Sequence, residues 1–206
     1  MKKRTSILAI LFIQCIALSV HAQTSADNSG TQHLYLDVHK LEPGSVTFSD
    51  VEAAHQKDLA TEAKYGVQFL KFWVDEKEGL VYCLSSASDS ADIKQTHAEA
   101  HGLIPDHIYE VTDGTADQML SGKKLFLDIH YLGAGNVTAT AVAGAHEKDL
   151  ATQSKYGVHF INYWVDEAEG VVICLSQADE AEDVIKTHTE AHGLIPTEVL
   201  EVQEGM

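Results

Sequence analysis

The chain has 206 residues, of which 45% are hydrophobic and 22% are charged, and its formal net charge is −17 at pH 7. This length is sufficient for two small domains that each bury a modest core. A chain this acidic is a poor partner for nucleic acid and for anionic membrane surfaces, because both repel negative charge.

The first 22 residues have the features of a secretory signal peptide. A basic start (MKKR) precedes an apolar stretch over 7–20, and the triplet VHA at 20–22 ends in the small residue that cleavage requires. We predict cleavage before Gln23, a periplasmic or secreted location, and no membrane insertion after cleavage. Residues 23–32 are small and polar, which indicates a flexible lead-in.

The remainder of the chain contains a duplication with an offset of 91 positions. Aligned without a gap, residues 34–111 and 125–202 are identical at 44 of 78 positions. We therefore predict a first module at 33–111, a polar linker at 112–124 and a second module at 125–203.

Each module shows the same succession of predicted elements. In the first, apolar and polar residues alternate over 34–39 as in a half-buried strand, and a helix runs from a capping box at Ser49 and Glu52 to Gly66. Strands at 67–74 and 80–85 flank the turn DEKEG, a second helix spans 90–101, and a strand at 108–111 closes the module. This βαββαβ order predicts an α+β, ferredoxin-like module, with one antiparallel four-stranded sheet and two helices on one face.

Four histidines in each module recur at the same offset, although duplication of a hydrophobic core does not require them. They are His39, His55, His97 and His101 in the first module, and His130, His146, His188 and His192 in the second. In the predicted topology, the end of the first strand, the start of the first helix and the end of the second helix lie at one end of the module. We therefore predict one metal site per module. Imidazole suits Ni²⁺, and Zn²⁺, Cu²⁺ and Co²⁺ are the alternatives.

The four positions differ in how specifically they indicate a metal ligand. His97 and His101 are four residues apart on one helix and can share an ion. His55 lies on the inward stripe of its helix, where a lone histidine is more often a packed core residue than a ligand. His39 is on the polar side of its strand and faces either the helices or the opposite face of the sheet. The carboxylates expected to orient the rings are Asp37, Asp58 and Glu99.

Two cysteines follow the predicted signal peptide, at equivalent mid-strand positions. Cys83 and Cys174 each sit among apolar residues (VYCLS and VICLS). We interpret them as buried free thiols, because a disulfide between them would require the two sheets to meet face to face. Apolar neighbours also disfavour a role as a catalytic nucleophile.

Several runs carry a resemblance to a known family. The segments LYLDVHKL, KYGVQFLKFWVDEKEG and HAEAHGLIP resemble the small nickel-binding, ferredoxin-like domains of bacteria that were long described as a domain of unknown function. The resemblance covers nearly all of 34–111 and again 125–202. The resemblance implies binding of a divalent metal, with nickel as the candidate. Members are generally single modules that pair as dimers, so a tandem copy implies an intramolecular pseudo-dimer. A further homo-oligomer stays open.

Three functions are compatible with these features, and we favour a binding protein over an enzyme. The leading hypothesis is an exported metal-binding protein that buffers, sequesters or delivers Ni²⁺ or a similar ion. Its affinity should fall as the pH drops through about 6.5, where free imidazole is protonated. The alternative is a small cofactor-free oxygenase or isomerase, with an apolar cavity on the exposed sheet face, His39 as base and Asp37 as its orienting partner. The third is a pure interaction module.

Overall fold

The computed structural model describes residues 30–206, so the predicted signal peptide and most of the predicted lead-in lie outside the described residues. Both modules have the predicted βαββαβ order. The first consists of β1 (His33–Lys40), α1 (Phe48–Thr61), β2 (Gln68–Asp75), β3 (Leu80–Ala87), α2 (Ser90–Ala100) and β4 (His107–Asp113). The second consists of β5 (Lys124–Tyr131), α3 (Ala139–Thr152), β6 (His159–Asp166), β7 (Val171–Ala178), α4 (Ala181–Ala191) and β8 (Glu198–Gly205). Within the described range, no helix combines the length and apolar character needed to cross a membrane.

The first helix of the module begins earlier than the capping prediction placed it. Thr47 is the N-cap: its hydroxyl accepts a hydrogen bond from the backbone N–H of Asp50, and the Asp50 carboxylate accepts one from the N–H of Thr47. The predicted capping box at Ser49 and Glu52 is therefore wrong, because Ser49 already lies in the first turn of α1. Both pairs have the same spacing, and the pattern alone did not distinguish them.

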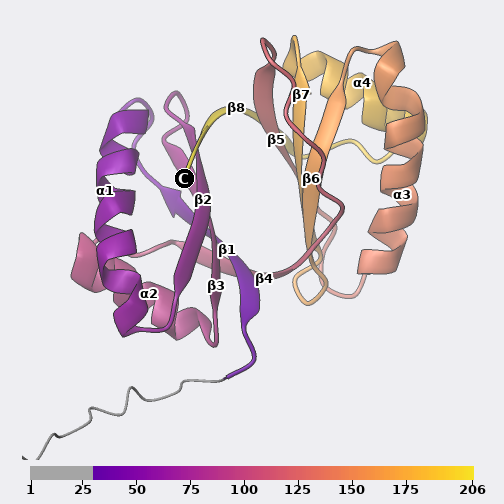
Figure 1. Ribbon diagram of the computed structural model, residues 1–206. Coiled ribbons are helices and arrows are strands. Elements are labelled where there is room, and N and C mark those ends of the chain that lie inside the picture. Colours follow the sequence, from indigo (N-terminus) through magenta and orange to yellow (C-terminus); the bar gives the residue numbers. More distant parts are fainter. Residues whose placement is uncertain (1–29) are drawn as a thin grey trace, which may run out of the picture.

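The two modules together form a closed barrel of eight strands, in the order β1-β3-β2-β8-β5-β7-β6-β4. Each module contributes a four-stranded antiparallel sheet, with its two helices on the outer face (Figure 1). The last strand of each module pairs with the second strand of the other, β4 with β6 and β8 with β2. For this reason β4 continues to Asp113, within the segment that was predicted to be linker.

The barrel interior is a hydrophobic core shared by both modules. Leu36 and Val38 of β1 belong to it, and the rings of Trp73 and Trp164 meet there with centres 5.1 Å apart. The sheet face that was expected to be exposed is therefore packed against the other module. The polar side of β1 is the side that the helices cover.

Candidate metal centre

Side chains from three elements meet between the helices and the sheet of the first module. Asp37 and His39, two residues apart on β1, face the same side of the sheet. Asp58 comes from α1, and His97 and His101 come from the last turn and the C-terminal cap of α2. Of the two orientations left open for His39, the structure has the one toward the helices, with its ring centre 5.0 Å from that of His97.

The two histidines of α2 both contact the carboxylate of Asp58. Nδ1 of His97 lies 3.0 Å from Nε2 of His101 and 3.0 Å from Oδ1 of Asp58. Nε2 of His101 in turn lies 3.1 Å from the same oxygen of Asp58. Two ring nitrogens and a carboxylate oxygen therefore face one another at nearly equal distances.

A second group of donors adjoins the first through the other edge of the His97 ring. Nε2 of His97 is 3.5 Å from Asp37, and Nε2 of His39 is 3.2 Å from the other oxygen of Asp37. Cys83 lies directly across from Asp37 in the pairing of β1 with β3, and its thiol completes a set with Asp37 and His39 whose donor atoms all lie within 4.8 Å of one another.

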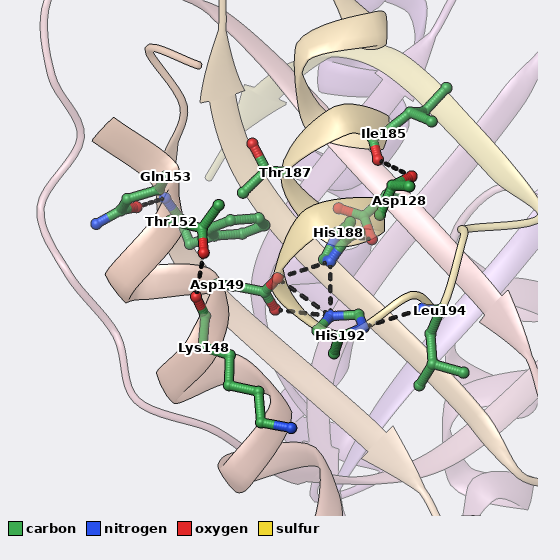
Figure 2. A network of polar contacts seen from close by, with 12 residues as sticks. Asp128, Lys148, Asp149, Thr152, Gln153, Ile185, Thr187, His188, His192 and Leu194 are labelled. Atoms are coloured by element: carbon green, nitrogen blue, oxygen red, sulfur yellow. Dashed lines mark hydrogen bonds and ion pairs between the residues drawn. The ribbon is translucent and has the colours of Figure 1, made fainter. Parts of the chain in front are cut away.

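The second module repeats this arrangement. Figure 2 shows His188 of α4 between Asp149 of α3 and Asp128 of β5, with His192 beside it. Nδ1 of His188 is 3.1 Å from Nε2 of His192 and 3.1 Å from Asp149, and its Nε2 is 3.1 Å from Asp128. The adjoining set in this module contains four donors, Asp128, His130, Cys174 and His188.

Two of the donors, Cys83 and Cys174, were not among the predicted metal ligands. The prediction that they are buried free thiols is confirmed. Their apolar neighbours disfavour a catalytic nucleophile, but the two cysteines lie directly opposite Asp37 and Asp128 in the sheets. The available signal was their repetition at the 91-residue offset together with the histidines. Burial raises the pKa of both thiols well above the ordinary value, so without a metal they carry their protons.

The two carboxylates beside His97, like those beside His188 in the second module, raise the pKa of the ring between them. Burial opposes the charged ring of His97, but Asp37 and Asp58 outweigh it and raise the pKa of His97 to about 9. Burial likewise opposes the charged ring of His188, and the corresponding carboxylates raise its pKa to about 10. Both rings are therefore imidazolium ions at neutral pH without a metal. An ion that uses the same nitrogens must displace a proton. The pKa that governs metal binding therefore lies well above 6.5, the pKa of free imidazole.

His55 and His146 lie outside both donor sets but line the pockets that contain them. The ring centre of His55 is 6.1 Å from that of Phe69 and 4.9 Å from that of Phe72. Those two residues face the same side although they are three apart, because β2 has a bulge between Phe69 and Lys71. Of the four repeated histidines, the structure thus brings three together with carboxylates and a thiol, and places the fourth at another wall of the same pocket.

Glu99 does not orient the histidines. Its carboxylate accepts hydrogen bonds from the Lys64 ammonium and the Tyr65 hydroxyl at the surface. Glu190 makes the equivalent contacts in the second module. The prediction that Glu99 supports the site is therefore wrong, because it sits on a different face of α2 from His97.

The donors fit a transition-metal ion in chemistry and in spacing. Two ligands at right angles, each about 2.1 Å from an ion, are about 3.0 Å apart, and two tetrahedral ligands are about 3.4 Å apart. The separations of 3.0 to 3.2 Å between the nitrogen and oxygen atoms fall in this range. In the second module, Oδ2 of Asp128 is also buried without a hydrogen-bond partner in the described part of the chain.

Comparisons with known proteins show the family. The model of the family described as "Nickel responsive protein SCO4226-like" matches residues 35–111 and again 126–202. No relative was found among the curated proteins. The structure of SCO4226 from Streptomyces coelicolor A3(2) is similar at 35% identity over 37% of this chain and 93% of that one, with a TM-score of 0.36.

Two longer structures are similar to both modules at low identity. A putative monooxygenase from Lactobacillus acidophilus NCFM has 11% identity over 84% of this chain and 94% of its own, with a TM-score of 0.47. Chlorite dismutase from Candidatus Nitrospira defluvii has 10% identity over 85% of this chain and 91% of its own, with a TM-score of 0.46. The match of the family model to both repeats is what places the chain: it belongs to the nickel-responsive, SCO4226-like family, with one copy of the family's domain in each module.

Proposed function

We propose that the chain is an exported protein that binds a divalent transition metal, with nickel as the preferred ion, at one His-rich site in each module. It would buffer, sequester or deliver the ion. The observation that carries the proposal is the pair of imidazole nitrogens that face one carboxylate at the same place in both modules, 3.0 Å apart in the first and 3.1 Å apart in the second. The family description adds nickel as the candidate ion.

The donor set supports a borderline or soft divalent ion. Imidazole nitrogen and thiolate sulfur select nickel, zinc, copper and cobalt, whereas calcium and magnesium prefer sites made of oxygen. His188 belongs to both groups of donors in the second module, and His97 contacts both groups in the first. Replacing either ring would therefore affect both groups of its module.

Isothermal titration of the purified protein with Ni²⁺, Zn²⁺, Co²⁺ and Cu²⁺ at about pH 7.5 tests the proposal. We expect two ions per chain, and the loss of both in a variant that combines His101→Ala with His192→Ala. His107→Ala is the matched control. Within the described chain, the ring of His107 lies at the surface and its one hydrogen-bond partner is the carboxylate of Glu169. Absence of binding for all four ions would refute the proposal.

Export is tested separately. The predicted signal peptide should direct the chain out of the cytoplasm, with a new N-terminus at Gln23. Fractionation of cells expressing the full chain, followed by N-terminal sequencing, would reveal the uncleaved chain in the cytoplasm if this part of the proposal is wrong.

The enzyme hypothesis has less support. It requires a cavity on the inner sheet face with His39 and Asp37 directed into it. Those two residues lie on the outer face beneath the helices, and the inner face is packed with apolar side chains from both modules.

A further inference from the structure

The histidine that caps the second helix of each module is hydrogen-bonded to the loop that follows it. The backbone N–H of Leu103 donates to Nδ1 of His101 at 3.1 Å, and the N–H of Leu194 donates to Nδ1 of His192 at 3.1 Å (Figure 2). A ring nitrogen that accepts a hydrogen bond carries no proton. In the metal-free protein, the ring proton of each of these histidines therefore lies on Nε2, the nitrogen that faces the aspartate of the donor set.

A metal ion in the proposed site would use that same nitrogen. Nε2 of His101 lies 3.0 Å from Nδ1 of His97 and 3.1 Å from Asp58, whereas Nδ1 of His101 points to the loop. A neutral imidazole that gives the lone pair of one nitrogen to an ion carries its proton on the other nitrogen. Ligation through Nε2 therefore places the ring proton on Nδ1, where it faces the N–H of Leu103. Two donors cannot share a hydrogen bond, so the bond between the loop and the ring is lost.

The ring then needs an acceptor that the present loop conformation does not offer. The side chain of His101 is 7% exposed, and a buried N–H group nearly always has a partner. A metal-bound histidine typically donates its second N–H to a carbonyl group, a carboxylate or a water molecule. For Nδ1 to find such a partner, the N–H of Leu103 must turn away from the ring.

The loop is built from residues that allow this change. Gly102 has a φ of +83° and its counterpart Gly193 has a φ of +80°, and a glycine in this region has a wide choice of ψ. In the described chain, a Cβ at either position would meet no atom within 4 Å beyond its chain neighbours. Leu103 and Ile104 are 48% and 50% exposed. A shift of the loop therefore disturbs little packing and moves an apolar pair at the surface.

We propose that the loops 102–104 and 193–195 are metal-responsive switches. In the metal-free protein, each loop donates an N–H to the capping histidine. When the ion binds Nε2, this nitrogen releases its proton to solvent and Nδ1 takes one up, so the charge of the ring is unchanged. The loop then turns its N–H away, and its exposed apolar residues move with it. The inference rests on the proposed function, because it requires His101 and His192 to bind the ion.

Nuclear magnetic resonance measures the bond and the proton directly. Protein labelled with ¹⁵N is compared without metal and with Zn²⁺, which is diamagnetic and takes the same donors. Without metal, we expect scalar coupling across the hydrogen bond between N of Leu103 and Nδ1 of His101, and ring shifts that place the proton on Nε2. With Zn²⁺, the coupling should vanish and the proton should be on Nδ1. The N–H groups of Asp106 and Thr197, which donate to carbonyls of β1 and β5 just beyond the loops, are the internal controls.

A pair of double variants tests the same bond through affinity. Leu103→Pro with Leu194→Pro removes both N–H donors, and proline is compatible with the negative φ of these two residues. Leu103→Ala with Leu194→Ala keeps the donors and is the matched comparison. Because an ion must break the bond before it can bind, we expect the proline pair to bind Ni²⁺ about two- to tenfold more tightly than the alanine pair. A bond that merely supports the site would give the opposite order.

The possible failures are distinguishable. Coupling that is absent without metal or that persists in the Zn²⁺-bound protein would overturn the switch. So would a ring proton that stays on Nε2 at full Zn²⁺ occupancy, or a proline pair that binds Ni²⁺ no more tightly than the alanine pair. Each of these results leaves the metal site itself intact. If titration shows no binding of Ni²⁺, Zn²⁺, Co²⁺ or Cu²⁺ to the wild-type protein, the proposed function and the switch are both overturned.

Discussion

Replacing His97 by leucine should destabilise the metal-free protein, whereas replacing His55 by leucine should stabilise it. His97 lies 3.0 Å from Asp58 and 3.5 Å from Asp37, and all three side chains are at most 4% exposed. His97→Leu leaves those carboxylates buried with one partner fewer each. Removal of one member of a buried ion pair destabilises by about 3–5 kcal/mol. We expect a loss of about 3 kcal/mol, at the lower end, because His39 and His101 still contact the carboxylates.

His55→Leu replaces an imidazole by an apolar side chain of similar size. The imidazole makes no hydrogen bond within the described residues. A buried polar group without a partner costs about 1–3 kcal/mol, and a change of shape in a packed site typically costs less than about 1.5 kcal/mol. The expected result is a gain in the free energy of unfolding of about 1 kcal/mol.

Urea unfolding with EDTA present, followed by tryptophan fluorescence and by circular dichroism, measures both effects. Coincidence of the two signals is needed first, since a two-module chain can unfold in more than one step. The reasoning is refuted if His97→Leu changes the unfolding free energy by less than about 1 kcal/mol, which is below the range for a broken buried pair. A clear destabilisation by His55→Leu would show that its nitrogens have partners after all.

Three further predictions concern the metal and the contact between modules. Because the raised pKa of His97 keeps this ring protonated up to about pH 9, metal affinity should rise from pH 7 to 9 with release of a proton, and titration in buffers of different ionisation enthalpy measures that release. Gly205→Ala places a Cβ 2.1 Å from Cζ of Phe72 in the other module and should destabilise by about 1–3 kcal/mol in thermal unfolding. Gly144→Ala has open space and is its matched control, expected to be neutral or slightly stabilising. Cys174→Ser should weaken Ni²⁺ at one of two sites and remove any thiolate-to-metal absorption band, and an unchanged spectrum would place the sulfur outside the coordination shell.

The duplication made much of the fold predictable. Alternating apolar residues, turn signals and capping residues occur twice at one offset, so the βαββαβ order did not depend on a single ambiguous pattern. The spacing of His97 and His101 likewise predicted their contact, because residues four apart on a helix are neighbours, and His101 keeps this contact as the C-terminal cap of α2. The position of the capping box was not fixed, since two overlapping pairs satisfied the same spacing.

The sequence by itself determined which residues recur and which of them are close through local geometry. Only the tertiary structure decided on which side of β1 Asp37 and His39 lie, because both faces of this sheet are covered, one by helices and the other by the second module. The place of Cys83 opposite Asp37 depends on the register between β1 and β3, which no local pattern specifies. His55 shows the same limit. Its helical stripe directs it inward, but the position of α1 over the sheet leaves it at the pocket wall, outside the donor sets.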